Sequence, residues 1–268
     1  MFTITHLIIY QLAMKAILVV HNLKKESNYA LTYASNLGAK LKTKVIIMNT
    51  VPEPLSVQLS DTDVQDMFDG EDFIIKGQDK GAENILFLSY LDTLGMSLHA
   101  ITAKYDIGLI IKGVSGTAKE INEQLTPILN HSGCPLLAVP EDASFNITNM
   151  GYLADLRYAK KDIVSFLSKM SEALDVKASL FNITESGLPL MNESYAETVF
   201  RQLFSNSGLN LVNIKERDIM KTVDVLANVM QVDFFVLSNR SSQLNSLWDW
   251  ENMENEEHAH LPALIFPC

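Results

Sequence analysis

Short apolar runs alternate along the chain with longer segments in which apolar residues recur every three or four positions. The runs are typical of strands that are buried on both faces, and the periodic segments are typical of amphipathic helices. In the first half of the sequence the pattern predicts strands over 16–20, 45–48, 85–88, 107–111 and 136–139, and helices over 30–42, 96–105 and 121–129. A short helix is also expected over 63–68, within a polar and acidic stretch.

The second half repeats this order of elements. Strands are predicted over 152–154, 179–183, 209–214, 234–237 and 263–266, and helices over 163–174, 195–204 and 219–230. Apolar strands that alternate with helices indicate a parallel sheet covered by helices on both faces. Only the segment 238–260 departs from the pattern of the first half.

The two halves align at constant offsets. A shift of 133 residues carries Ile17–Val20 onto Met150–Leu153 and 45–49 onto 178–182. A shift of 127 residues carries 105–110 onto 232–237 and 134–140 onto 261–267, so one insertion or deletion of about six residues separates the two blocks. Such regular offsets predict one fold that has been duplicated and fused.

The fold class expected is therefore α/β, with two tandem Rossmann-like or flavodoxin-like domains over 14–143 and 144–268. Residues 1–13 are apolar and precede a Met-Lys pair that resembles a natural chain start. We interpret them as an upstream extension or start-site artefact, and the alternative is an added segment packed on a sheet edge.

Composition excludes several classes of protein. The chain has 268 residues, of which 47% are hydrophobic, and a formal net charge of −11. This charge argues against a nucleic-acid surface, which requires a basic patch. No apolar run is long enough to suggest a membrane span. The two cysteines, Cys134 and Cys268, are too few for a disulfide-stapled secreted protein and favour a cytoplasmic location.

Candidate chemistry lies where the predicted strands end, because ligands of open parallel sheets bind beyond the carboxyl ends of the strands. In the first half this places Asn22, Thr50 and the loop after the fourth strand at the crevice. That loop begins Gly113-Val114-Ser115-Gly116, and its glycines would let backbone N–H groups approach a phosphate at a helix N-terminus. The hydroxyls of Ser115 and Thr117 could add hydrogen bonds, although a tight turn that needs glycine explains the pattern equally well.

With these features the chain resembles a tandem universal stress protein. Nucleotide-binding members of that family carry an Asp at the end of the first strand and G-x2-G-x9-G-[S/T] after the fourth. Gly113 and Gly116 match the first two glycines, but Asn22 stands at the Asp position and Thr126-Pro127 stands where the family has Gly-Ser or Gly-Thr. The resemblance implies a weakened site for ATP or AMP in the first domain, with Pro127 in a first helical turn.

In the second domain the losses are reversed. Asp155 matches the Asp of the family, whereas Arg240 and Gln243 replace the glycines. We expect no nucleotide there.

The resemblance also implies that the two fifth strands pair antiparallel and form a pseudo-dimer within one chain. If Leu137 pairs with Ile265, Cys134 faces Cys268, and a redox-sensitive bridge is one hypothesis. Two reduced cysteines at strand ends are the alternative.

Three functions remain open at this stage. The first is a cytosolic stress-response binding or regulatory module that binds a purine nucleotide in domain 1, and the second is a nucleotide-independent scaffold. The scaffold would use a partner-binding surface at 245–260, which contains two tryptophans and an acidic run, although a helix or loop that covers the sheet with Trp248 buried is the simpler interpretation. The third is a slow ATP hydrolase, but no catalytic motif is present, so no enzyme activity is expected.

Two further expectations concern metals and partners. His258 and His260 with two neighbouring glutamates resemble a metal site, but a solvated acidic loop is the simpler interpretation. No nucleic-acid or membrane partner is expected; a protein partner, or further dimerisation of the fused pair, is left open.

Overall fold

The computed structural model describes residues 16–50, 85–141, 143–184, 187–205, 207–216, 219–238 and 261–267. The predictions for 1–13, 63–68 and 245–260, and those for Arg240, Gln243 and Cys268, therefore lie outside the described residues. No helix among those described is long and apolar enough to cross a membrane.

The first half of the fold, residues 16–140, contains every strand that the hydrophobic pattern predicts there. Its elements are β1 (Ala16–His21), α1 (Lys25–Leu41), β2 (Lys44–Asn49), β3 (Ile85–Leu88), α3 (Tyr90–Thr93), α4 (Leu98–Tyr105), β4 (Ile107–Val114), α5 (Ala118–Ser132) and β5 (Leu136–Pro140). The short helix α3 was not predicted, although Ser89 and Asp92 form the capping box that begins it.

The second half, residues 149–266, follows the same plan. Its elements are β6 (Asn149–Ala154), α6 (Lys161–Leu174), β7 (Lys177–Ile183), α7 (Glu193–Phe204), β8 (Asn210–Ile214), α8 (Ile219–Asp224), a π-helical turn (Val225–Val229), β9 (Phe234–Ser238) and β10 (Ala263–Phe266). The predicted helix over 219–230 is thus α-helical only in its first part and widens into a π turn.

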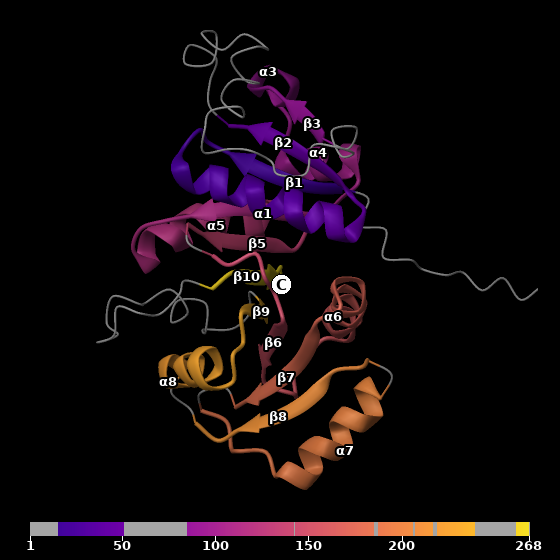
Figure 1. The fold of residues 1–268 in the computed structure, drawn as a ribbon. Helices are drawn as coiled ribbons and strands as arrows, with labels where there is room; N and C mark the ends of the chain where they lie inside the picture. Colours follow the sequence, from indigo (N-terminus) through magenta and orange to yellow (C-terminus); the bar gives the residue numbers. More distant parts are fainter. Residues whose placement is uncertain are drawn as a thin grey trace, which may run out of the picture.

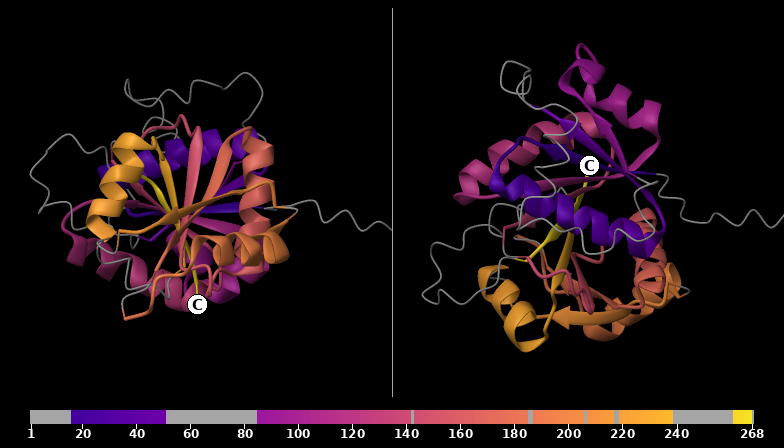
Figure 2. Two further views of the ribbon diagram at one scale, coloured as in Figure 1. Left: turned by 90° about the horizontal axis from the view of Figure 1, so that it is seen from below. Right: turned by 45° about the horizontal axis from the view of Figure 1, so that its top comes forward.

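All ten strands form one sheet in the order β3-β2-β1-β4-β5-β10-β9-β6-β7-β8. Each half has the same internal order read outward from the centre, and within each half the strands are parallel. The halves meet through β5 and β10, which pair antiparallel as expected. Figure 1 shows the two halves joined at this central pair, and the end-on view in Figure 2 shows the strands fanning about a common axis.

The register of the central pair differs by one residue from the prediction. Leu137 pairs with Leu264, not with Ile265. A one-residue slip turns a strand's side chains to opposite faces, so packing decides the register. Here Leu137 and Leu264 both join the apolar cluster on one face, and Leu136 pairs with Ile265 in the cluster on the other. The thiol of Cys134 donates to the carbonyl of Ile107 at 3.3 Å.

Helices cover both faces of the sheet, and each face has its own apolar core. The residues from α1, α6 and α7 pack into one cluster, and those from α4, α5 and α8 pack into the other. Each cluster also includes strand residues from both halves, so the core is continuous across the β5–β10 pair. The α/β fold with a duplicated, internally paired arrangement is therefore confirmed.

Candidate functional site

The strand order of the first half reverses between β1 and β4, which defines the crevice where open α/β sheets bind ligands. His21 ends β1 there and Val114 ends β4. Thr50, which follows β2, donates from both its N–H (2.9 Å) and its hydroxyl (3.0 Å) to the carbonyl oxygen of His21. The structure thus brings Asn22 and Thr50 to the same strand end, as the sequence predicts.

Asn22 forms hydrogen bonds with the residues at the start of α1. Its Oδ1 accepts a hydrogen bond from the N–H of Lys24 at 3.1 Å and a short one from the hydroxyl of Ser27. Its Nδ2 donates to Oε1 of Glu26 at 3.4 Å, and its own N–H donates to the Ser27 hydroxyl at 3.2 Å. The side chain therefore satisfies backbone and side-chain groups at the first turn of the helix.

Gly113 lies inside β4 rather than in the loop that the sequence suggested. It pairs with Val139 of β5, and the strand continues to Val114. A Cβ at Gly113 would overlap the carbonyl oxygen of Glu26 in the first turn of α1. Glycine is thus required for close contact between α1 and β4, which explains it without a phosphate.

The turn after β4 is occupied by a carboxylate of the chain itself. Gly116 adopts φ +100°, which suits glycine, and Thr117 then caps α5. Oε2 of Glu120 accepts from the N–H of Thr117 at 2.8 Å and from its hydroxyl at 3.0 Å. The backbone and side-chain hydrogen bonds from Thr117 lower the pKa of Glu120. A carboxylate of the chain itself therefore already lies at the N–H of Thr117, at the start of α5. The carbonyl of Ser115 accepts from the side chain of Gln124 at 3.2 Å.

Thr126 and Pro127 lie farther along the chain, and the position of Pro127 corrects an expectation drawn from the family motif. Both lie inside α5, and Pro127 is not in its first turn. The side chain of Thr126 is exposed, and its hydroxyl donates to the carbonyl of Asn122 at 2.6 Å. The reason is local, because the Thr117–Glu120 capping box begins the helix directly after Gly116.

Two ionisable side chains beneath the crevice are buried. Lys112 is 6% exposed, and its Nζ has no hydrogen-bond partner among the described residues. Burial lowers its pKa, while the charge of Glu26 acts in the opposite direction. Burial likewise lowers the pKa of His21, whose Nε2 lies 3.0 Å from Oδ1 of Asn28. Burial at this strand end therefore disfavours the charged forms of both Lys112 and His21.

A cavity of about 380 Å³ opens one strand further along, on the face covered by α4 and α5. Val20, Met48, Asn49 and Thr50 at the ends of β1 and β2 line one side. Another side is lined from α3 and its following turn, by Tyr90, Thr93, Leu94, Gly95 and Met96, together with Leu98 and Ile101 of α4 and Ile128 of α5. Sequence reasoning identified Thr50 but missed the α3 wall, which the Ser89-x-x-Asp92 capping signature could have indicated. This cavity is a concave site of the first half at the carboxyl ends of its strands.

The corresponding strand end of the second half carries a closed ion pair. The side chain of Asp155 is 1% exposed and accepts from Nε and Nη2 of Arg157 at 2.8 and 2.7 Å. Next to it, Oδ1 of Asn182 accepts from the N–H of Leu156 at 2.9 Å. The Asp that matches the family motif is therefore neutralised within the chain.

No group of three or more potential metal ligands is found within the part of the chain that the structure describes. A partner-binding role for 245–260 stays a prediction.

Comparisons with known proteins agree with this architecture. No protein-family model and no curated protein matches the chain. Among solved structures, a universal stress protein from Archaeoglobus fulgidus DSM 4304 superposes with a TM-score of 0.61 at 9% identity, covering 95% of this chain and 98% of that one. The chain has the universal stress protein fold.

Two structures from Pseudomonas aeruginosa are also similar. One, from strain UCBPP-PA14 and named as a universal stress protein, has a TM-score of 0.61 at 12% identity, with 95% of both chains covered. The other, a functionally unknown protein from strain PAO1, has a TM-score of 0.60 at 11% identity and covers 95% of this chain and 94% of that one. Coverage of both halves means that these proteins share the tandem arrangement. At this low identity, the similarity is evidence for a shared fold alone.

Proposed function

We propose that this protein is a binding or regulatory module of the universal stress type that takes a small ligand in the cavity of its first half. The observation that carries the proposal is the 380 Å³ cavity at the carboxyl ends of β1 and β2. Its size is within the range of small-molecule sites, and its position is the one that open α/β sheets use. No catalytic step is part of the proposal.

The lining favours a ligand with an uncharged, largely apolar body. Asn49 and Thr50 supply polar groups at one side, and no Lys, Arg, Asp or Glu is among the described lining residues. A purine base with its ribose has this character. ATP or AMP was the expectation from the sequence, and the geometry at Glu120 favours the compounds with fewer phosphates.

The turn at Gly116, where the phosphates of a nucleotide would lie, bears on the choice of ligand. Glu120 accepts the N–H of Thr117, so a polyphosphate at Gly116 would have to displace a bound carboxylate or sit against it. Among purine compounds, we therefore propose adenosine and AMP ahead of ATP.

The test is calorimetric titration of the full chain with adenosine, AMP and ATP. The expected result is saturable binding of adenosine and AMP, with weaker binding of ATP. At a free ligand concentration of about one hundred times Kd, the bound protein gains about 2.7 kcal/mol of stability, so a thermal shift provides a second readout. Failure of all three compounds to bind would overturn the purine proposal.

Two matched variants locate the site. Leu94 lines the cavity and is 60% exposed, whereas Leu91, three residues earlier, is 57% exposed and does not line it. Leu94→Trp should narrow the cavity and abolish ligand binding, while Leu91→Trp should bind like the wild type. Equal binding by both variants would place the ligand elsewhere.

A further inference from the structure

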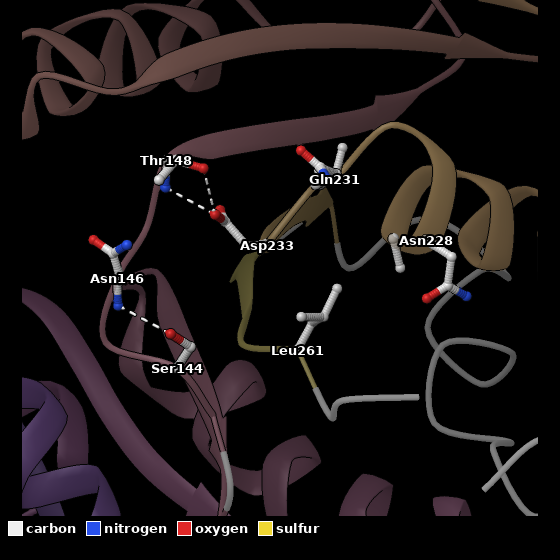
Figure 3. A pocket seen from close by; sticks show the side chains of 9 residues that line it. Ser144, Asn146, Thr148, Asn228, Gln231, Asp233 and Leu261 are labelled. Atoms are coloured by element: carbon white, nitrogen blue, oxygen red, sulfur yellow. Dashed lines mark hydrogen bonds between the residues drawn. The ribbon is translucent and has the colours of Figure 1, made fainter. Parts of the chain in front are cut away.

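A second concave site lies in the second half of the molecule. It has a volume of about 370 Å³ and is lined by residues that precede strands β6, β9 and β10 of the second half (Figure 3). β6 and β10 each pair parallel with β9, so the three strands begin at the same edge of the sheet. The cavity lies at this amino-terminal edge. The cavity is therefore distinct from the carboxyl-edge crevices described above.

The walls of this cavity come from two unusual connections. One wall is the linker between the halves, whose Ser144, Asn146 and Thr148 face the site. The other is the π turn after α8, in which the N–H of Met230 donates to the carbonyl of Val225 at 3.0 Å. Gln231 follows with φ +53°. In the first half, α4 passes into β4 through the single residue Asp106 with no π turn, so this wall is specific to the second half. π turns are frequent at functional sites.

The one carboxylate among the described lining residues, that of Asp233, already accepts three hydrogen bonds. Oδ2 of Asp233 accepts from the N–H and the hydroxyl of Thr148, both at 2.8 Å, and Oδ1 accepts from the N–H of Asn149 at 3.0 Å. Figure 3 shows Asp233 turned toward Thr148, with the two hydrogen bonds between these residues drawn. Asp233 therefore fastens the linker to the start of β9, and it has little capacity left for a ligand.

The remaining polar groups are neutral and partly unused. Asn146 and Gln231 are exposed, and their carboxamides form no hydrogen bond within the described parts of the chain. They come from the two different walls (Figure 3), and each can both donate and accept. Val232 and Leu261 provide apolar surface between them, and Val232 is buried.

These properties define the class of ligand. No Lys, Arg or His is among the described lining residues, so an anion would meet the charge of Asp233 without a counter-charge. A metal ion would find one carboxylate, which three donors already occupy. A neutral molecule with many hydroxyl groups matches the carboxamides and hydroxyls, and its C–H face matches the apolar surface.

We propose that this cavity is a binding site for an uncharged polyhydroxyl ligand of mono- or disaccharide size. Asn146 and Gln231 hold its hydroxyl groups from opposite walls, and Leu261 packs against its apolar face. Because the ligand would bridge the linker and the second half, its binding would also bias how the linker is held.

The experiment is a titration of the ¹⁵N-labelled full chain, followed by NMR, with glucose, maltose, trehalose and myo-inositol as probes. At least one neutral probe should give saturable shifts that include the side-chain amide signals of Asn146 and Gln231. Glucose 6-phosphate is the charged control, and it should bind at least tenfold more weakly than glucose, its neutral parent, because its phosphate would meet the carboxylate of Asp233 without a counter-charge.

Variants separate this site from non-specific sugar contacts. Asn146→Leu removes one carboxamide, and Gln231→Gly removes the other while keeping the positive φ; each should weaken binding at least tenfold. Gln202→Leu, on exposed α7, is the matched control and should leave it unchanged. The proposal is overturned if no neutral probe saturates, if neither cavity variant changes the affinity, or if a charged control binds as tightly as its neutral parent.

Discussion

Replacing Lys112 by Met should make the protein more stable near neutral pH. Lys112 lies between the buried residues Val20 and Ala138 on the neighbouring strands, and its ammonium has no hydrogen-bond partner among the described residues. Met retains the apolar stem and removes the charge, so the packing against both neighbours is kept.

The magnitude follows from two opposing effects. A buried polar group without a partner costs about 1–3 kcal/mol, and more if it is charged. The attraction between Lys112 and the carboxylate of Glu26 offsets part of this cost, but burial is the larger influence on the pKa of Lys112. We therefore expect Lys112→Met to increase the free energy of unfolding by about 1–2 kcal/mol. This value is the cost of one unsatisfied buried group, which the substitution removes, minus the attraction to Glu26, which it also removes.

The pH dependence gives this prediction a distinctive signature. In the unfolded chain Lys112 titrates near pH 10.4, and in the folded protein its pKa is lower. Between the two pKa values the unfolded state binds more protons, so the wild type gains stability as pH rises. The advantage of Lys112→Met should therefore be largest near neutral pH and shrink toward about pH 10. Nearby His21 and Glu26 are present in both proteins, so comparing variant with wild type isolates Lys112.

The assay is urea denaturation of both proteins, near neutral pH and at about pH 10. Lys119→Met, on a lysine whose side chain is 86% exposed, is the control and should change stability little at either pH. The prediction is wrong if Lys112→Met is less stable than wild type near neutral pH, or if the difference does not shrink as the pH rises. Either result would mean that the buried ammonium is stabilised by more than its attraction to Glu26.

Three further changes test the packing and the buried pair, each by urea denaturation. Gly113→Ala should destabilise the protein by about 3 kcal/mol, because the new Cβ would push against the carbonyl of Glu26; wild-type stability would mean that α1 shifts freely. Tyr33→Phe should leave stability unchanged or raise it by about 1 kcal/mol, because the buried hydroxyl has no partner among the described residues; a loss would reveal one. Arg157→Ala should cost about 3 kcal/mol by leaving the Asp155 carboxylate buried without its ion pair. The double variant Arg157→Met, Asp155→Asn should lose less, and an equal or larger loss would contradict that explanation.

Most of the fold could be predicted from the sequence because buried parallel strands need continuous apolar runs. The offsets of 133 and 127 residues between the halves correspond to strands that occupy equivalent places: β1 and β6 begin 133 residues apart, and β4 and β9 begin 127 apart. The same hydrophobic pattern could not show where β4 ends. Gly113 and Val114 join the strand because β5 supplies partners for them, and a pairing partner is not visible in local sequence.

The candidate site was less predictable, for two different reasons. One is a local signal that was outweighed: Thr117 and Glu120 have the spacing of a capping box, which starts α5 directly after Gly116 and places Pro127 inside the helix. The other is truly tertiary. The neighbour of Gly113 is the first turn of α1, far away in sequence, so a glycine needed for helix packing looks the same as one needed for a phosphate.

By itself, then, the sequence determined the duplicated α/β plan, since hydrophobic periodicity reports which faces of each element are buried. Only the tertiary structure decided the register of β5 against β10, the solvent-free position of Lys112 and the two cavities. Each of these depends on which side chains from distant segments meet, and on how closely their backbones approach, and neither is encoded in the period of a local pattern.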